Sequence, residues 1–312
     1  AMEMTSTALA NGYEGAWVLE HHFSKYGLCP SALAMSAFLL GRFPKLKVTT
    51  GVVVLPNIHP IHVAEQVALL DQASGGRLSM GIGRGIFQRD FEIFARSFGV
   101  APDASHLAMR ESMELIERAW HETTVRGDGR FYNFDDVEVY PKLRTGQRIP
   151  IYVAAESPST IEWAAERGYA MALGYWLSGE SIRSNLELYS AIAEQSGHDP
   201  GLVDHSVACI AHVEDTTEAA RVSVEPYLNW WREEGFRIGF NRNQLATMKN
   251  YEFHKTKGTE VLLREKRATG RDAKTLMDLN PVGDEQYCIE RLQSALAGTR
   301  IRHIICAVEA SG

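Results

Sequence analysis

The sequence contains few cysteines and no long hydrophobic run. Its four cysteines, Cys29, Cys209, Cys288 and Cys306, show neither CxxC nor zinc-site spacing. With 312 residues, of which 45% are hydrophobic, the chain can bury a core without disulfides. No apolar run approaches the ~18 residues of a membrane span, and the first residues lack the basic-then-apolar order of a signal peptide. We therefore expect reduced thiols in a cytoplasmic protein that does not cross a membrane.

An excess of positive charge is also absent. The chain has 32 Lys and Arg against 39 Asp and Glu, which gives a formal net charge of −7 and a pI near 5.9. This balance offers no electrostatic attraction for nucleic acid or for an anionic membrane surface. P-loop, GxSxG and GxGxxG motifs do not occur. The composition favours a protein that acts on small molecules.

Short β-branched runs alternate with segments of helical period along the chain. They predict strands at 16–20, 47–55, 77–83, 149–155, 169–175, 206–213 and 302–308. The helical patterns lie at 60–72, 104–122, 157–167, 180–196, 215–235 and 284–297. Such alternation is typical of βα units around a parallel sheet.

The number of predicted strands bears on the fold class. An open α/β sheet of seven strands would satisfy the pattern, but seven strands in a chain of this length are closer to a (β/α)8 TIM barrel that lacks its first strand. The opening segment 1–15 has the look of the last turns of a helix and a glycine stop. We therefore expect one barrel domain over 1–312, with a strand and part of a helix preceding it in the native protein.

One long segment carries no clear strand pattern. Residues 236–283 are rich in Lys, Arg, Asn and Gly, and they far exceed the usual loop length. Loops of this length in compact domains commonly serve as lids over a site. We predict a lid over about 251–279.

Three polar residues, Glu20, His21 and His22, end the predicted strand at 16–20. In a βα barrel the carboxyl ends of the strands carry the chemistry. A metal site would need three or four convergent ligands, to which His59 and His62 could add two, although His62 falls inside a predicted helix. His59 alone has the position of a helix cap or packing residue. Catalytic histidines and an ordinary polar strand end both remain open.

Alternate glycines follow the predicted strand at 77–83. Gly81, Gly83 and Gly85 would let the backbone approach a flat ligand, and Arg84 offers a cation for a phosphate. A tight strand-to-helix turn would explain the same glycines. The motif alone leaves both readings open.

Two hydroxyl residues, Ser157 and Thr160, lie at the predicted start of the helix at 157–167. Backbone N–H groups and the helix dipole make such a start an anion site. Ordinary helix capping would explain one of the two hydroxyls equally well. Together with Arg84, the pair predicts a single phosphate pocket.

Five segments, taken in order, resemble the bacterial luciferase family of flavin-dependent monooxygenases. They are "LEHHF", "VVLPNIHP", "AEQVALLDQASGGR", "GIGRGIFQRDF" and "VAAESPSTIEWAA". Later segments such as "ELYSAIAEQSGHD", "NYEFHKTKG" and "LNPVGDEQYCIERL" are similar to the α-subunit branch of that family. The resemblance covers essentially the whole chain.

The resemblance implies a (β/α)8 barrel that binds reduced FMN supplied by a separate reductase. It also implies reaction with O2 through a C4a-hydroperoxyflavin, which would oxidise a long-chain aliphatic aldehyde to the carboxylic acid, with or without light. The alternatives are a non-luminous FMNH2-dependent monooxygenase acting on another carbonyl or secondary metabolite, and a non-catalytic flavin-binding partner subunit. A homodimer or a heterodimer with a β-like subunit is expected.

The resemblance assigns catalytic roles to three residues. His21 takes the place of the general base or acid beside the flavin, a task that suits the ordinary histidine pKa near 6.5. His22 and Asp90 complete the catalytic set, and Glu20 and His22 are expected to support His21. Phe91 and Trp231 correspond to flavin- or substrate-facing positions. No metal is expected, because the family site contains none.

The resemblance also assigns a cofactor-binding set. Its members are Gly51, Val52, Gly83, Arg84, Glu156, Ser157, Thr160 and Tyr175. A non-prolyl cis peptide is implied between Gly51 and Val52. Gly83 stands in place of a reactive cysteine, and Tyr175 stands in place of a tryptophan. Within the predicted lid, Lys266 replaces a histidine and Arg271 is kept.

Overall fold

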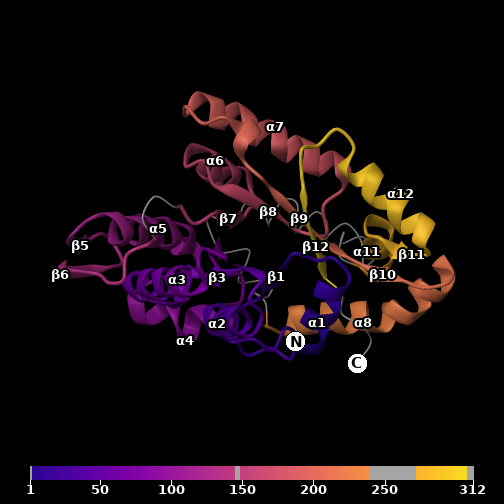
Figure 1. The fold of residues 1–312 in the computed structure, drawn as a ribbon, viewed down its shortest axis with the longest axis horizontal. Coiled ribbons are helices and arrows are strands. Elements are labelled where there is room, and N and C mark those ends of the chain that lie inside the picture. Colours follow the sequence, from indigo (N-terminus) through magenta and orange to yellow (C-terminus); the bar gives the residue numbers. More distant parts are fainter. Residues whose placement is uncertain (1, 145–147, 239–271, 308–312) are drawn as a thin grey trace. The chain divides into compact units, whose positions relative to one another are not determined.

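The computed structural model describes residues 2–144, 148–238 and 272–307 (Figure 1). The described residues form two compact units. The first extends to Ile151, and the second comprises residues 152–237 and the described residues after 271. Parallel strands alternate with helices in both units, as the sequence predicts.

The strands of the first unit are β1 (Gly15–Val18), β2 (Lys47–Thr50), β3 (Val53–Val54) and β4 (Leu78–Gly83). β2 lies between β1 and β4, all in parallel register, and β3 also pairs with β4. The predicted strand at 47–55 is therefore divided in two, and the division falls at a cis peptide between Gly51 and Val52. The resemblance implied this cis bond, whereas the residue pattern alone predicted one continuous strand.

The pairing of β2 with β4 depends on a close approach at Gly81. A Cβ atom at this position would lie 2.0 Å from the Thr50 carbonyl oxygen, so no other residue fits without moving the backbone. The Thr50 hydroxyl donates to the Gly81 carbonyl and accepts from the Gly81 N–H, both at 2.9 Å. Gly81 therefore serves strand packing, while Gly85 adopts the left-handed conformation, with φ of 76°.

Helices alternate with these strands along the first unit. They are α1 (Met2–Ala10), α2 (Ala32–Arg42), α3 (Pro60–Ser74), α4 (Gln88–Ile93) and α5 (Ser105–His121). Short 3-10 helices lie at η1 (Leu55–Asn57), η2 (Ala95–Phe98) and η3 (Pro102–Ala104). His59, for which a cap or a packing role was open, acts as a cap, because its Nδ1 accepts from the Ile61 N–H at 3.3 Å where α3 begins.

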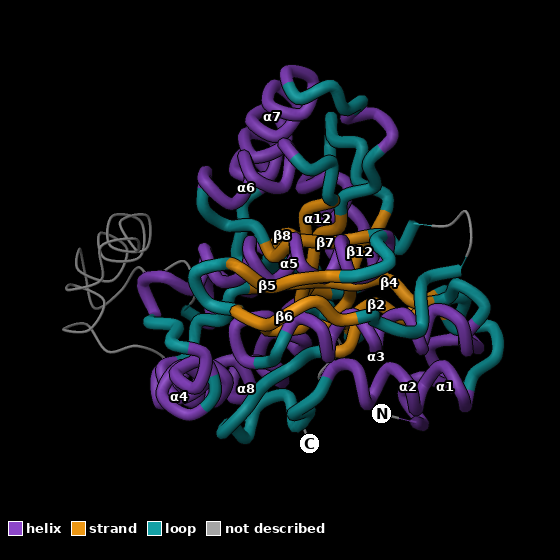
Figure 2. Tube along the Cα trace, turned by 90° about the vertical axis from the view of Figure 1, so that its left-hand side faces the viewer, coloured by secondary structure: helices purple, strands orange, loops and turns teal. Residues whose placement is uncertain are grey.

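An antiparallel hairpin of β5 (Val125–Asp128) and β6 (Asn133–Val137) follows α5 (Figure 2). Its strands are mostly polar, and the sequence pattern did not predict them. The Glu111 carboxylate on α5 accepts the N–H groups of Arg130, Phe131 and Tyr132 at the turn. A tertiary contact therefore holds the hairpin where the local sequence gives no strand signal.

The main sheet contributes four described parallel strands to the second unit, paired in the order in which they occur along the chain. They are β7 (Ile151–Ala154), β8 (Ala170–Leu173), β9 (Ser206–Ile210) and β12 (His303–Ala307). A short parallel pair is formed by β10 (His212–Val213) and β11 (Val282–Gly283). The helices are α6 (Pro158–Glu166), α7 (Gly179–Gln195), α8 (Thr217–Ile238), α11 (Ala273–Leu279) and α12 (Glu285–Leu296), with the 3-10 helix η4 (Pro200–Leu202).

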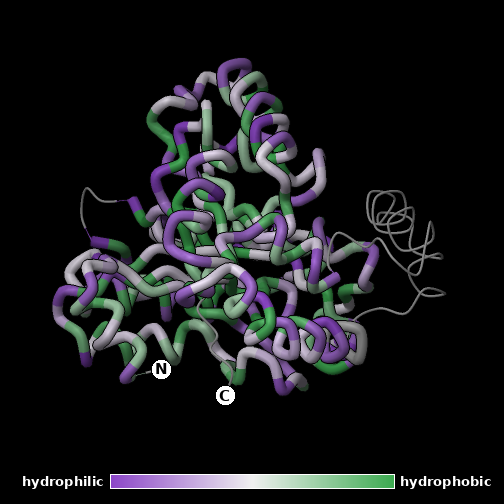
Figure 3. The backbone as a smooth tube through the Cα atoms, turned by 90° about the vertical axis from the view of Figure 1, so that its right-hand side faces the viewer, coloured by the Kyte–Doolittle hydropathy of each residue, from purple (hydrophilic) through white to green (hydrophobic). Residues whose placement is uncertain are grey.

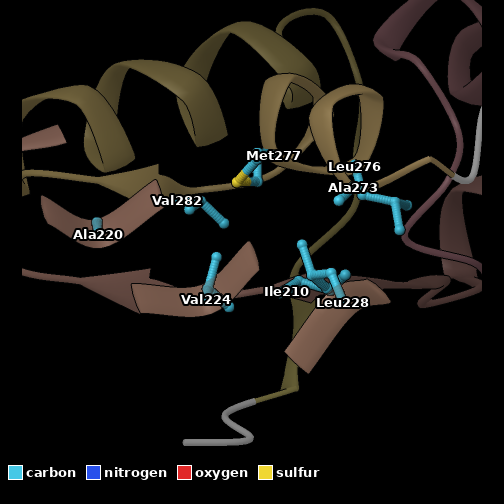
Figure 4. Packing of buried hydrophobic residues seen from close by; sticks show 8 residues of the cluster. All are labelled: Ile210, Ala220, Val224, Leu228, Ala273, Leu276, Met277 and Val282. Carbon is cyan, nitrogen blue, oxygen red and sulfur yellow. The ribbon is translucent and has the colours of Figure 1, made fainter. Parts of the chain in front are cut away.

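A hydrophobic cluster joins α8, α11 and the end of β9 (Figure 4). Its members are Ile210, Ala220, Val224, Leu228, Ala273, Leu276, Met277 and Val282. The buried Asn280 side chain donates to the carbonyl oxygens of Tyr175 and Leu276 and accepts from the Ile210 N–H. The amide thus satisfies backbone groups from three segments, which holds the cluster in one arrangement.

The predicted lid falls partly on described residues. Residues 251–271, with Lys266 and Arg271, lie outside them. From Asp272, which caps α11 by accepting from the Thr275 N–H at 2.9 Å, the segment is helical and its apolar side is buried. This end of the predicted loop is therefore a packed helix.

Hydrophobic and hydrophilic residues are mixed along the helices (Figure 3). Within the described ranges, no helix has both the length and the apolar character needed to cross a membrane.

Candidate functional site

Glu20 anchors the polar cluster that follows β1 in the first unit. Its Oε2 accepts from the Ala32 N–H at 3.0 Å, where α2 begins, and its Oε1 accepts from the Val54 N–H at 3.2 Å in β3. One carboxylate therefore pairs with a backbone N–H at a helix start and with another at a strand edge. Glu20 therefore fixes the backbone around the two histidines.

His22 connects Glu20 to Asp90. Its Nε2 lies 3.8 Å from Glu20 Oε1, and this interaction raises the pKa of His22 above its ordinary value. Its ring packs edge-on against Phe94, with centroids 4.8 Å apart. The negative charge of Asp90 adds to the rise in the pKa of His22. His22 is thus the histidine that carries positive charge most readily in this cluster.

Asp90 lies on α4 and is only 1% exposed. Its Oδ2 accepts from Asn57 Nδ2 at 3.4 Å, and its Oδ1 is buried without a hydrogen-bond partner in the described chain. Burial raises the pKa of Asp90 to about 6, and the positive charge of His22 acts in the opposite direction. This carboxyl can gain or lose a proton near neutral pH.

The pKa of His21 is shifted in the opposite direction from that of Asp90. Its ring packs against Tyr26 and Phe87, with centroids 4.8 Å and 5.5 Å away. Its Nδ1 is buried and has no hydrogen-bond partner among the described residues. Burial, followed by the charge of His22, lowers the pKa of His21 to about 4. His21 is therefore a neutral imidazole at pH 7, which differs from the ordinary titration near 6.5 on which its predicted role was based.

Basic groups gather where β4 ends. Arg84 follows the buried Gly83, and His106 lies in the first turn of α5. Burial lowers the pKa of His106, and the charges of Arg84 and Arg110 lower it further, while Asp103 opposes them. His106 Nδ1 is buried without a hydrogen-bond partner in the described part of the chain. The sequence analysis missed His106 because no motif surrounds it, and only the fold brings it to Arg84.

The hydroxyl pair of the second unit lies at the start of α6. Ser157 Oγ is 2.9 Å from Thr160 Oγ1 and 3.3 Å from Ser159 Oγ. Ser157 occupies the N-cap position, yet its side chain makes no hydrogen bond to the helix backbone. Ordinary capping therefore does not account for these hydroxyls. Glu156, just before them, is partly buried.

Tyr175 follows β8 and lies among aromatic rings. Its ring meets Trp176 and Trp231 edge-on, with centroids 4.8 Å and 5.6 Å apart. All three border the cluster of Figure 4. Asn280 donates to the Tyr175 carbonyl oxygen at 2.7 Å, so both the ring and the backbone of Tyr175 are held in place.

The metal hypothesis receives no support from the histidines that could have joined Glu20, His21 and His22. His59 caps α3, and His62 is an exposed residue of the same helix, with its Nδ1 3.8 Å from Glu65 Oε2. Across the described ranges, no three His, Cys, Asp or Glu side chains are grouped as metal ligands would be.

Comparison with a solved structure identifies the fold. The oxygenating constituent of 3,6-diketocamphane monooxygenase from Pseudomonas putida, determined in complex with FMN, matches with a TM-score of 0.74 at 18% identity. The match covers 99% of this chain and 85% of that one. The chain is thus an α/β protein of the TIM-barrel class, and the predicted barrel of parallel strands is confirmed.

Sequence comparison identifies the family. The model of the luciferase-like monooxygenases matches residues 1–303. The alkanal monooxygenase alpha chain of a Kryptophanaron alfredi symbiont is 36% identical over 301 residues, which are 96% of this chain and 83% of that one. The beta chain from Photobacterium leiognathi is 24% identical over 224 residues, or 72% of this chain and 68% of that one. The chain belongs to the luciferase-like monooxygenase family, as its motifs indicated, and is an enzyme of that family.

Proposed function

We propose that this enzyme uses reduced FMN and O2 to oxidise a long-chain aliphatic aldehyde to the carboxylic acid. The observation that carries the proposal is a polar cluster in which His22 lies 3.8 Å from Glu20 and interacts with both Asp90 and His21. Within it, the pKa of His21 is lowered to about 4 and that of Asp90 is raised to about 6. Titratable groups whose environments move their pKa values in opposite directions are typical of acid–base sites. Identity to the alkanal monooxygenase alpha chain over nearly the whole chain supports the aldehyde as substrate.

The residues present fit a flavin mononucleotide. Asp90 Oδ1, which is buried without a hydrogen-bond partner in the described chain, suits the hydrogen-bonding edge of an isoalloxazine ring. The backbone at Gly51, Val52 and Gly83 would bind the flat ring. Within the first unit we assign the phosphate to Arg84 with His106. In the second unit, Ser157 and Thr160 form a hydroxyl pair that suits a phosphate, and the cofactor-binding roles of Glu156 and Tyr175 stay predictions from the resemblance.

Each residue of the cluster has a distinct task. When bound, the reduced flavin supplies the activation of O2 and the transfer of one oxygen atom to the carbonyl. The His21 imidazole would accept a proton or a hydrogen bond, because the lowered pKa keeps it neutral at pH 7. The Asp90 carboxyl would donate a proton, with the charge of His22 moderating its pKa. The rings of Tyr26 and Phe87 exclude water around His21.

The proposal extends to partners. We propose that a separate flavin reductase supplies the reduced cofactor. Similarity to both the alpha and the beta chains of alkanal monooxygenase supports a dimer, either of two identical chains or with a β-like subunit. Analytical ultracentrifugation of the purified chain distinguishes a homodimer from a monomer that lacks its partner.

The decisive experiment mixes the purified protein with photoreduced FMN, O2 and a long-chain aldehyde while light and acid are recorded. Acid formation in proportion to flavin consumed is the expected result. Acid without light would retain the monooxygenase and exclude luminescence. A protein that binds FMN but forms neither product would be a non-catalytic partner subunit, and the proposed function would be wrong.

A further inference from the structure

Two cysteines of the second unit face each other across neighbouring parallel strands. The register pairs Cys209 of β9 with Cys306 of β12, and the two sulfur atoms are 3.9 Å apart. Backbones of neighbouring strands lie about 4.8 Å apart, a separation that a disulfide can bridge, since bridged Cα atoms lie about 4.4–6.8 Å apart. We propose that Cys209 and Cys306 form a redox-active dithiol, which hydrogen peroxide oxidises to a disulfide between β9 and β12.

The surroundings give the two thiols different roles. Cys306 is partly exposed, whereas Cys209 is buried, so an oxidant in solution meets Cys306 first. The Cys209 thiol donates to the Cys306 sulfur, which favours a thiolate on Cys306. The same contact, together with burial, raises the pKa of Cys209. Cys306 is therefore the attacking sulfur, and Cys209 is the thiol that resolves the product.

The oxidation balances with peroxide as the only oxidant. The Cys306 thiolate attacks one oxygen of hydrogen peroxide, the O–O bond breaks, and hydroxide leaves and takes a proton to become water. Cys306 is then a sulfenic acid. The Cys209 sulfur attacks the Cys306 sulfur, the S–O bond breaks, and the departing hydroxide carries away the Cys209 proton as water. Two thiols lose two electrons, and one peroxide becomes two waters.

The other two cysteines are held by backbone carbonyls and serve as internal controls. The Cys288 sulfur lies 3.6 Å from the Gly283 carbonyl oxygen, and Cys288 is 6% exposed. Cys29 belongs to the first unit, where its thiol donates to the Ser31 carbonyl oxygen at 3.4 Å. Among the described residues, neither sulfur makes a hydrogen bond to another cysteine, so neither is expected to form the disulfide.

The test treats the reduced wild-type protein with hydrogen peroxide, then blocks remaining thiols with iodoacetamide under denaturing conditions and maps the peptides. Two of the four thiols should be lost, with a mass decrease of about 2 Da before the iodoacetamide step and one linked peptide pair containing Cys209 and Cys306. Dithiothreitol should restore both thiols. The result does not depend on flavin turnover, so it stands apart from the test of the proposed function.

Variants separate the two roles. Cys209→Ser should stop the reaction at a Cys306 sulfenic acid, which dimedone traps, and Cys306→Ser should leave Cys209 unmodified. Cys288→Ser should still form the disulfide and is the matched buried control. The inference would be overturned if wild-type Cys306 reached sulfinic acid without a linked peptide, if Cys288 took part in the link, or if all four thiols survived peroxide.

Discussion

The Thr50 hydroxyl makes two hydrogen bonds of 2.9 Å to Gly81, one to the backbone N–H and one to the carbonyl. Both residues are buried, so replacing Thr50 by valine leaves a buried donor and acceptor unpaired. We expect Thr50→Val to lower the free energy of unfolding by about 2–4 kcal/mol. Urea denaturation measures this, and Thr50→Ser, which keeps the hydroxyl, should lose much less. Equal losses in the two variants would show that the hydroxyl is not the cause.

Replacing Asp90 should separate activity from stability. The pKa of Asp90 in the folded chain, about 6, lies above the value near 3.9 of an unfolded aspartate. Its contribution to stability is therefore present below about pH 4 and is lost as the pH rises through about 6. We expect Asp90→Asn to raise the free energy of unfolding at pH 7 by on the order of 1–3 kcal/mol. Product formation should fall at least tenfold.

The control for this variant is Asp136→Asn, which changes an exposed carboxyl of β6. It should alter neither the stability at pH 7 nor the turnover. Thermal unfolding at pH 5 and pH 8 gives the comparison. If Asp90→Asn were less stable than wild type at pH 8, burial of an ionised Asp90 would have to be stabilising, and the assigned pKa would be wrong.

His21 predicts the opposite pH dependence. Its folded pKa of about 4 lies below the ordinary value of 6.5, so the stability it contributes is present above about pH 6.5 and is lost as the pH falls through about 4. We expect His21→Gln to weaken this acid-side loss and to reduce turnover by about 10²- to 10⁴-fold at neutral pH. Stopped-flow product measurements and acid unfolding test the two effects separately.

His62→Gln is the matched control for His21, because that side chain is 64% exposed on α3. It should change neither turnover nor the acid unfolding profile. Undiminished turnover of His21→Gln would remove His21 from the proposed chemistry, whatever its effect on stability.

His106 should make phosphate binding depend on pH. Burial, and then the charges of Arg84 and Arg110, disfavour its protonated form, and a bound phosphate would favour it again. Binding of FMN should therefore take up a proton. When the pH is lowered from 8 to 6, the affinity of wild type relative to that of His106→Gln should rise by about 3- to 10-fold. Flavin fluorescence measures the FMN affinity of both proteins at each pH. Protonation of the phosphate itself affects both affinities equally, so it cancels in their ratio.

Riboflavin, which lacks the phosphate, is the control ligand for this effect. Its affinity ratio between wild type and His106→Gln should not change between pH 8 and pH 6. A pH effect of equal size with riboflavin would place His106 at the ring rather than at the phosphate.

Much of the fold could be predicted from local pattern. The runs at 149–155, 169–175 and 302–308 are strands within a few residues of their predicted bounds. Short apolar, β-branched runs between helical segments favour strands of a parallel sheet. The hairpin of β5 and β6 could not be predicted, since it depends on Glu111 from another element. The helix α11 was missed because it is short and because its apolar residues are buried by contacts with distant segments, namely α8 and the end of β9.

The candidate site, like the fold, could be predicted from the sequence only in part. Sequence motifs and their resemblance to a family located Glu20, His21, His22 and Asp90, because these residues follow strand ends in a recognisable order. They gave no information on which group titrates near neutral pH. That property depends on how completely each group is removed from water. Burial lowers the pKa of His21 to about 4 and raises the pKa of Asp90 to about 6.

The sequence by itself determined the alternation of strands and helices, the family and the identity of most candidate residues, because these depend on residue type and spacing. Only the tertiary structure decided that Glu20 holds two backbone segments, that Thr50 bridges to Gly81, and that Cys209 meets Cys306. Each of these contacts joins residues at least 12 positions apart. Their geometry follows from strand register and side-chain burial, and a linear pattern specifies neither.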